Sequence, residues 1–235
     1  MYREIALYYD LIYSWKDYKK EAKKVKKLIL KYKKSDGNDL LDIACGTGKH
    51  LDYLKNTFSC MGVDINEEMI NIAKKNVRGV NFKKADMITL NLNKKFDIII
   101  CLFSSIGYVK TYSNLKKCIQ NFANHLKRCG VVIFEPWLTK STYIEGFPHM
   151  NTYDGEDIKI ARLNISKIEG NLSVLDMHYL IAERNKEIKY YKDRHELGLF
   201  EIEKTLEFMK EAGFKPEFLK KGLMKDRGLY IGVKK

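Results

Sequence analysis

Short runs of apolar and β-branched residues alternate with helical patterns along the first 135 residues of the chain. Five of these runs predict strands, at 39–44, 59–63, 80–85, 96–103 and 130–135. Helical patterns lie between them, near 48–56, 67–77 and 112–128, and Asn66 is a suitable N-cap for the second helix. Strands that alternate with helices form βαβ units, so the pattern predicts an α/β fold with a mainly parallel sheet.

The pattern changes after the fifth predicted strand. Three long strand-like stretches follow, at 158–169, 172–183 and 187–199, and the tight turns EGN and RNKE join them. A helix at 201–212 then ends at Gly213, and two last strands, 216–221 and 228–234, complete a seven-stranded main sheet. We therefore predict a core at 1–136 and 200–235, with an antiparallel β insert at 137–199 over one end of it.

The segment 16–34 carries many of the lysines that give the chain its net charge of +13. Its apolar residues recur at three- and four-residue steps, which predicts a helix with one buried stripe and basic outer faces. The stripe consists of Tyr18, Ala22, Val25, Ile29 and Tyr32. Clustered lysines can bind nucleic acid. No RNA-recognition, KH or zinc-finger motif accompanies them, so we favour a solvated face and expect no nucleic-acid partner.

Length and composition limit the classes of protein to which the chain can belong. A chain of 235 residues with 45% hydrophobic content can fill one core. No apolar run reaches the roughly 18 residues that a membrane span needs, and the first residues lack a signal-peptide pattern, so we expect a cytoplasmic protein without a membrane partner. Five cysteines without a CxxC pair predict buried free thiols, with neither a disulfide framework nor a metal site.

The stretch LLDIACGTGKH, residues 40–50, has the composition of a nucleotide-binding loop. A P-loop would need glycine where Ile43 stands and Ser or Thr where His50 stands. A dinucleotide fingerprint would need a third glycine where Leu51 stands. The carboxylate of Asp42 would repel a pyrophosphate and suit a cationic ligand. The loop therefore predicts a ligand without phosphate at this position.

The residues 42–48, DIACGTG, resemble motif I of the class I S-adenosylmethionine (SAM) methyltransferases, E/D-x-G-x-G-x-G. Ala44 replaces the first glycine of that motif. The resemblance implies a Rossmann-like methyltransferase fold and SAM as the cofactor. It implies that Asp42, Ala44, Gly46 and Gly48 form the cofactor loop.

Three further elements carry the same resemblance. Asp64 ends the second strand, where a carboxylate can accept hydrogen bonds from both ribose hydroxyls. Asp86 follows the third strand, where the family holds the adenine amino group, and Met87 would offer its backbone N–H to the ring. Phe103 follows the fourth strand, where its backbone would lie near the methionine end. All of these residues fall at carboxyl ends of predicted strands, where open α/β sheets bind ligands.

A more specific resemblance covers nearly the whole chain. The sequence is similar to the aminosugar N,N-dimethyltransferases that act on nucleoside-diphosphate 3-amino-sugars. The matching stretches are YDLIYSWKDY, LLDIACGTGKHL, FSSIGYV, EPW, MHYLIA and DRGLYIGV. The run after EPW, Leu138 to Lys140, departs from these relatives, so the sugar and the acceptor amine stay open. Because the similarity extends through the insert, it implies that the insert covers the substrate.

The resemblance also implies roles for individual aromatic residues. Tyr9 and Tyr18 would close over the methionine part of SAM. The substrate side would include Tyr2, Tyr108, Trp137 and Arg227. The guanidinium fork of Arg227 matches phosphate oxygens, as a sugar nucleotide requires. His178 and His195 match the family too, but strand histidines are more often packing residues, so we assign them no catalytic role.

Methyl transfer to an amine needs a neutral nitrogen aligned with the sulfur–methyl bond. We expect alignment to supply most of the rate, with Tyr108 or Tyr2 as a hydrogen-bond acceptor near the amine and no obligatory base. Two alternatives remain open: an RNA or protein methyltransferase that uses the basic first helix, and a SAM-binding module without catalysis. The sequence also leaves a homodimer open.

Overall fold

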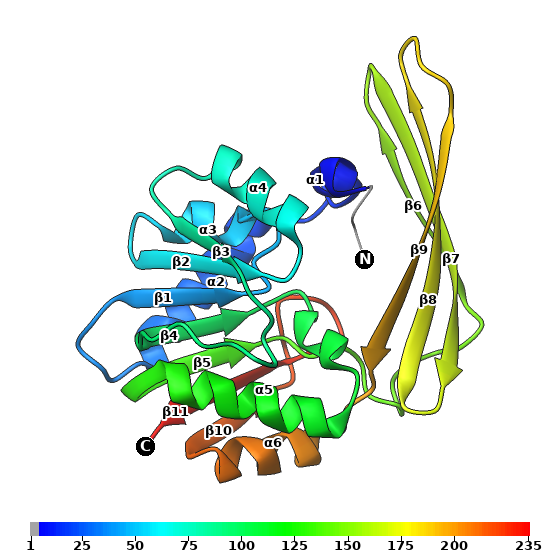
Figure 1. Cartoon of the computed structure of the whole chain (residues 1–235). Coiled ribbons are helices and arrows are strands. Elements are labelled where there is room, and N and C mark those ends of the chain that lie inside the picture. The colour runs from blue at the N-terminus through cyan, green and yellow to red at the C-terminus, as the bar shows by residue number, and fades with distance from the viewer. Residues whose placement is uncertain (1–4) are drawn as a thin grey trace.

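A computed structural model of the chain describes residues 5–235. Seven strands form the main sheet in the order β10-β11-β5-β4-β1-β2-β3 (Figure 1). Their bounds are Asp39–Ile43 (β1), Ser59–Asp64 (β2), Asn81–Lys84 (β3), Phe96–Cys101 (β4), Leu126–Phe134 (β5), Phe214–Leu219 (β10) and Leu229–Lys234 (β11). Strands β1 to β5 pair in parallel, and β11 pairs antiparallel with both β5 and β10. The predicted mainly parallel seven-stranded fold is confirmed.

Helices cover both faces of this sheet. They are α2 (Tyr18–Tyr32), α3 (Lys49–Leu54), α4 (Glu67–Asn76), α5 (Tyr112–His125) and α6 (Ile202–Glu211). Alternate residues of β4 enter different cores: Ile99 packs with α5 and α6, whereas Ile98 packs with α2, α3 and α4. Burial on both faces explains why the central strands are continuously apolar in the sequence.

A second, four-stranded antiparallel sheet follows β5, in the order β6-β7-β8-β9. Its strands are Pro148–Asp154 (β6), Ile158–Glu169 (β7), Leu172–Glu183 (β8) and Lys189–Gly198 (β9). Figure 1 shows this insert sheet standing opposite the ends of β1, β2 and β4. Three of its strands were predicted. Strand β6 was missed because it is a mostly exposed edge strand that begins with a proline and shows no buried alternate face.

The boundary between α5 and β5 differs from the predicted one. The helix predicted at 112–128 ends at His125, and β5 begins at Leu126 instead of 130. Cys129 has a φ of 61°, and the β4–β5 register shifts between Phe96 and Ile98. Strand β5 therefore begins in an irregular segment whose polar residues resemble a helix end.

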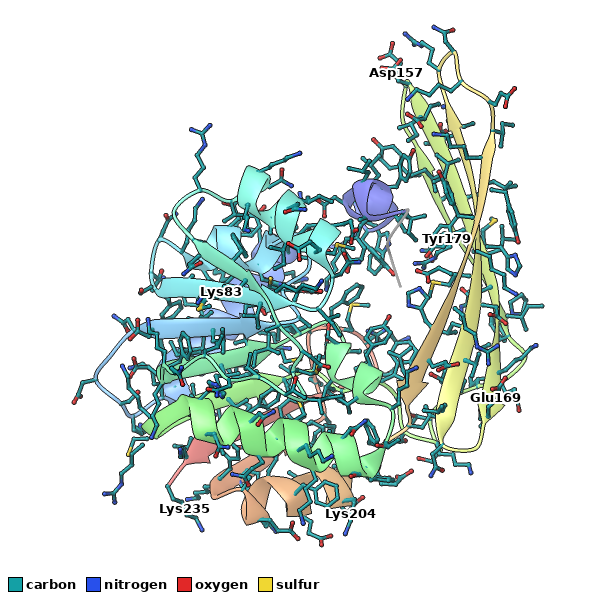
Figure 2. All side chains as sticks on the ribbon, in the orientation of Figure 1. Lys83, Asp157, Glu169, Tyr179, Lys204 and Lys235 are labelled. Atoms are coloured by element: carbon teal, nitrogen blue, oxygen red, sulfur yellow. The ribbon has the colours of Figure 1, made fainter. Side chains whose placement is uncertain are left out.

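A short N-terminal segment, η1 (Ala6–Tyr8) and α1 (Tyr9–Ile12), was not predicted and lies between the two sheets (Figure 1). Ile5, Ile12 and Tyr13 pack into one core with Leu175 and Tyr179 of the insert. In Figure 2, side chains from α1 and from the insert, Tyr179 among them, fill the space between these elements. The segment therefore connects the insert to the main sheet.

The basic helix forms as predicted, as α2, with Ala22, Val25 and Ile29 buried. Two of its lysines make tertiary contacts: the Lys24 ammonium donates to backbone carbonyls of the segment before β11, and Lys26 donates to Thr57. All five cysteines are free. Within residues 5–235, no helix is both long enough and apolar enough to cross a bilayer.

Candidate functional site

A cavity of about 1290 Å³ lies where the carboxyl ends of β1 to β4 face α1 and the insert. Residues of both sheets form its wall. The predicted site residues that line it are Tyr9, Ala44, Gly46, Asp64, Asp86, Met87, Phe103, Tyr108, Trp137 and Arg227. These residues come from segments far apart in the chain, so the fold brings the predicted cofactor and substrate residues to one cavity.

The loop after β1 presents its backbone to the cavity at Gly46. Ala44 and Gly46 have φ values of 59° and 55°, in the left-handed region. A Cβ atom at Gly46 would meet no atom within 4 Å, because that position opens into the cavity. Gly48, with a φ of 79°, has a different role: a Cβ there would lie 3.1 Å from Val77 Cγ2. Gly46 therefore leaves room for a ligand, and Gly48 leaves room for α4.

Asp64 lies beside this loop at the end of β2. Its Oδ2 accepts a hydrogen bond of 2.9 Å from the Gly46 N–H, and its Oδ1 accepts one of 2.9 Å from the Asn66 N–H. Burial raises the pKa of the Asp64 carboxyl, and these backbone hydrogen bonds oppose the rise. The Asn66 side chain caps α4, as predicted. Asp64 does not have to cap the helix, so its carboxylate can serve a ligand.

The segment after β3 carries the predicted adenine-binding pair. Asp86 Oδ1 accepts a hydrogen bond of 2.8 Å from the Ile88 N–H, which folds this segment into a turn. The Asn121 side-chain amide, on α5, donates to the carbonyl oxygens of Met87 and Ile88 at 3.1 and 2.6 Å. Asn121 was not predicted, because in the sequence it is one of several polar residues of a helix and no motif distinguishes it.

Three predicted cofactor residues do not line the cavity within residues 5–235. Asp42 is buried beneath the loop, and burial followed by the charge of Asp64 raises the pKa of its carboxyl. The Tyr18 ring packs edge-on against His50 with centroids 5.0 Å apart. Gly48 faces α4, as described above. Tyr2 lies outside the described residues. Asp42, Tyr18 and Gly48 therefore pack behind the loop instead of facing the cavity.

Helix α1 holds the same loop from the other side. The Thr47 hydroxyl donates a hydrogen bond of 2.7 Å to Asp10, and the Lys49 ammonium lies 3.3 Å from the same carboxylate. Tyr9 lines the cavity, and its ring packs 4.7 Å from that of Tyr13. The N-terminal segment therefore brings two tyrosines over the loop, one of which the sequence analysis did not name.

The loop after β4 carries backbone strain. Phe103 and Ser104 have φ values of 54° and 60°, which cost non-glycine residues of order 1–3 kcal/mol each. The Lys16 ammonium lies 4.3 Å from the centre of the Phe103 ring. Glu21 pairs with both Lys16 and His50, the latter at 2.8 Å, in a buried cluster. This cluster holds the strained loop from the side of α2, and no local sequence pattern predicts it.

Arg227 lies where the loop before β11 meets the cavity. Its Nη1 donates a hydrogen bond of 2.9 Å to Ser104 Oγ, and its guanidinium carbon lies 4.4 Å from the centre of the Trp137 ring. Burial lowers the pKa of the guanidinium, and the negative charge of Glu135 opposes the fall. Trp137 is fixed in turn, since its Nε1–H donates a 2.7 Å hydrogen bond to Ser173. A partly desolvated, stacked guanidinium is suited to bind an anion.

Tyr108 contacts a histidine for which no catalytic role was predicted. The Tyr108 hydroxyl lies 2.7 Å from His195 Nδ1, and His195 Nε2 lies 3.2 Å from Asp193 Oδ2. The His195 side chain is fully buried. Tyr108 and His195 are 87 positions apart in the sequence, so only the fold reveals the contact.

The arrangement of the cavity fits SAM. Gly46 opens to the cavity and carboxylates lie at the ends of β2 and β3, as the ribose and the adenine amino group require. Tyr9, Tyr13 and Phe103 also line the cavity. Their rings form one cluster, with centroids 4.7 Å (Tyr9–Tyr13) and 5.1 Å (Tyr13–Phe103) apart, which suits a sulfonium cation. Among residues 5–235, no group of three or more His, Cys, Asp or Glu is arranged to hold a metal ion.

Comparisons with known proteins agree with this geometry. Residues 40–130 match the model of the methyltransferase domain family. The chain is 32% identical over 228 residues to the dTDP-3-amino-3,4,6-trideoxy-α-D-glucopyranose N,N-dimethyltransferase of Streptomyces venezuelae, covering 96% of this chain and 95% of the relative. It is 31% identical to the dTDP-3-amino-3,6-dideoxy-α-D-glucopyranose N,N-dimethyltransferase of Streptomyces fradiae, covering 98% and 91%.

Solved structures support the same assignment. DesVI from Streptomyces venezuelae superimposes with a TM-score of 0.91 at 32% identity, covering 97% of each chain. A SAM-bound amino pentose methyltransferase from Micromonospora echinaspora superimposes with a TM-score of 0.84 at 25% identity, covering 94% of this chain and 92% of the other. Both similarities run through the insert as well as the main sheet. The chain therefore belongs to the family of SAM-dependent aminosugar N,N-dimethyltransferases.

Proposed function

We propose that this enzyme methylates the amine of a nucleoside-diphosphate amino sugar. The observation that carries the proposal is the position of Arg227, which stacks on Trp137 at 4.4 Å in the same cavity as the cofactor residues. A sugar nucleotide brings two phosphates, and a guanidinium binds phosphate oxygens through paired hydrogen bonds. The cavity of about 1290 Å³ exceeds the 300–1,000 Å³ usual for one small ligand, so it has room for a cofactor and a sugar nucleotide together.

Asp64 and Asp86 would hold the nucleoside part of SAM, and the backbone of Gly46 would contact the methionine part. When bound, SAM supplies an electrophilic methyl group on a sulfonium. The remaining task of the chain is alignment: Tyr9, Tyr13 and Phe103 exclude water at one end, and the insert holds the acceptor. Alignment alone can supply effective molarities of about 10⁵–10⁸ M. We therefore keep the hypothesis that no base is obligatory and that the Tyr108 oxygen accepts a hydrogen bond from the amine.

The test is turnover on a panel of nucleoside-diphosphate amino sugars and simple amines, with methylated products measured by mass spectrometry. We expect methylation of at least one amino sugar nucleotide and little of amines without phosphate. For Arg227→Lys we expect KM for the sugar nucleotide to rise about 10- to 100-fold with KM for SAM unchanged, because lysine cannot form the bidentate contact. Arg184→Lys, at an exposed turn of the insert, is the matched control.

Failure of every amino sugar nucleotide to react, while a phosphate-free amine reacts, would contradict the proposal. An equal response of the two arginine variants would contradict the role of Arg227. Two lysines of the basic helix, Lys24 and Lys26, contact neighbouring segments of the chain and are therefore less available to an RNA substrate.

A further inference from the structure

Tyr108, His195 and Asp193 form a chain of polar contacts that ends in the cavity. The Tyr108 hydroxyl lies 2.7 Å from His195 Nδ1, and Asp193 Oδ2 lies 3.2 Å from His195 Nε2. Tyr108 lines the cavity, whereas the His195 side chain is fully buried and the Asp193 side chain is 15% exposed. A hydroxyl, an imidazole and a carboxylate therefore follow one another from the cavity wall into the insert.

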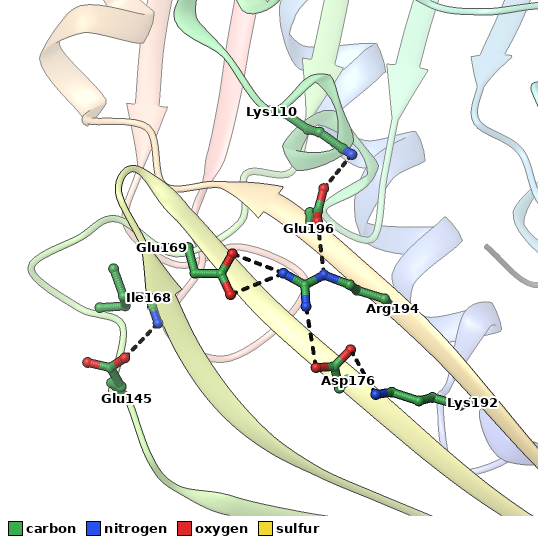
Figure 3. Close-up of polar contacts among 8 residues, drawn as sticks. All are labelled: Lys110, Glu145, Ile168, Glu169, Asp176, Lys192, Arg194 and Glu196. Carbon is green, nitrogen blue, oxygen red and sulfur yellow. Dashed lines mark hydrogen bonds and ion pairs between the residues drawn. The ribbon is translucent and has the colours of Figure 1, made fainter.

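The fold holds this chain of contacts closely. Tyr108 lies in η2 (Ser105–Val109), and the neighbouring Gly107 allows close approach to β9, because a Cβ atom there would lie 3.0 Å from Leu197. Lys110 and Glu196, which also line the cavity, pair at 2.6 Å. Figure 3 shows that Glu196 also contacts Arg194, which in turn binds carboxylates of β7 and β8. The η2 segment is thus fixed to β9 at Glu196 and Leu197, directly after His195.

The Asp193 carboxylate lies at ion-pair distance from one nitrogen of the His195 ring, and this position favours one tautomer. A carboxylate 3.2 Å from Nε2 favours the tautomer with its proton on Nε2, which leaves a lone pair on Nδ1. The Tyr108 hydroxyl must then donate to Nδ1. Because its proton is used there, Tyr108 can accept a hydrogen bond from an amine in the cavity and cannot donate one to it.

We propose that His195 and Asp193 are positioning residues that keep Tyr108 an acceptor and receive the proton released from the substrate nitrogen. Each methyl transfer forms one N–C bond, breaks one S–C bond and releases one proton. That proton passes from nitrogen to the Tyr108 oxygen as the tyrosine proton passes to His195 Nδ1. The resulting imidazolium lies beside the Asp193 carboxylate. After the product leaves, His195 returns a proton to the Tyr108 oxygen as the Tyr108 hydroxyl releases one to water in the cavity.

The inference deepens the proposed function, on which it depends for the identity of the amine. One measurement needs no substrate: ¹⁵N NMR of the histidine side chains in the unaltered protein, with the His195 signals assigned through their loss in His195→Gln. We expect a protonated Nε2 and an unprotonated Nδ1. A proton on Nδ1 would overturn the inference even if the enzyme methylates amino sugars.

The second measurement is a double-mutant cycle in kcat at saturating SAM and amine. Because His195 acts through Tyr108, we expect His195→Gln to lower kcat about 10- to 100-fold in the unaltered background and less than twofold in Tyr108→Phe, with KM for SAM unchanged. The control pair is His178→Gln and Tyr190→Phe, a histidine–tyrosine contact of 2.6 Å on the exposed face of the same sheet, and we expect it to leave kcat unchanged.

Equal losses for His195→Gln in both backgrounds would overturn the inference, because they would mean a structural role independent of Tyr108. Absence of any loss would overturn it as well. If the protein methylates no amino sugar nucleotide, the proposed function fails, and the tautomer measurement still decides this inference by itself.

Discussion

The Asp64 carboxylate combines three properties at one residue. It ends a parallel strand, it lines the cavity, and it accepts hydrogen bonds from the Gly46 and Asn66 N–H groups. Each carboxylate oxygen has a second lone pair, which is available to a ribose hydroxyl. Cofactor affinity should therefore depend on the charge at this position.

For Asp64→Asn we expect S-adenosylhomocysteine to bind about 10- to 100-fold more weakly, because hydrogen bonds to a charged group contribute about 1.5–3 kcal/mol. Isothermal titration calorimetry measures the change. Asp52→Asn is the control, since Asp52 lies on the outside of α3 and pairs with Lys55. Equal affinities of Asp64→Asn and the unaltered protein would exclude Asp64 from cofactor binding.

A second prediction concerns Gly46 and Gly48. Substitution of Gly46 should mainly weaken cofactor binding, whereas substitution of Gly48 should mainly reduce folding stability. Gly46→Ala should cost about 1–2 kcal/mol of folding free energy for its left-handed φ and reduce cofactor affinity strongly, because its methyl group enters the cavity. Gly48→Ala should cost about 2–4 kcal/mol, because its methyl group meets Val77 and Phe82, and should affect binding less. Urea unfolding and titration of the two variants measure both. A larger loss of stability in Gly46→Ala, together with a larger loss of cofactor affinity in Gly48→Ala, would contradict this prediction.

Residues that belong to local motifs could be predicted from the sequence. Asp64, Asp86 and Gly46 lie at fixed positions after strands, and a strand that is buried on both faces is visible as an apolar run. His195 and Lys16 could not be predicted in the same way. Their roles come from pairings across 87 positions and from contacts with a distant ring, which no local spacing encodes.

At the scale of elements, α2 does more than cover the sheet. Its buried residue Glu21 pairs with Lys16 and with His50, and Lys16 in turn lies over the Phe103 ring. Burial raises the pKa of the Glu21 carboxyl, but hydrogen bonds from His50 and Lys16 outweigh burial and hold the pKa below its usual value of 4.5. The helix thereby links its own packing to the strained loop after β4.

Glu21→Gln should lower the free energy of unfolding by about 3–5 kcal/mol at pH 7, because it leaves the Lys16 ammonium buried without its partner. A lowered folded-state pKa stabilises the protein fully above the unfolded value of 4.5, and this contribution is lost as the pH falls through the folded value. The difference in the free energy of unfolding between Glu21→Gln and the unaltered protein should therefore become smaller below pH 4.5.

Urea unfolding at several pH values measures this difference. Glu187→Gln, at an exposed turn of the insert, should change stability by less than about 0.5 kcal/mol at every pH. A difference for Glu21→Gln that grows toward acid pH would contradict the assignment of a lowered pKa.

Some helices and strands could be predicted from the sequence, and others could not. The apolar stripe of α2 and the meander of β7, β8 and β9 could be predicted because one face of each is buried. Strand β6 and the short helices η1 and α1 could not, because their structure depends on neighbours in the insert. The same dependence makes α1 the connection between the two sheets.

At the scale of the whole molecule, two sheets face one cavity and each supplies a different chemistry. The main sheet contributes carboxylates and open backbone at the ends of β1, β2 and β3, while the insert contributes the surroundings of Tyr108 and Trp137. Arg227 contacts both parts, through Ser104 and Trp137. We infer that the cofactor binds to the main sheet and that the acceptor lies between that sheet and the insert.

A crystal structure with S-adenosylhomocysteine and a nucleoside-diphosphate amino sugar tests this account most directly. We predict the adenosine between Asp64 and Asp86, the diphosphate against Arg227, and the sugar amine between the sulfur atom and the Tyr108 hydroxyl. Adenosine bound away from the ends of β2 and β3, or a sugar whose amine points away from the sulfur, would contradict the account.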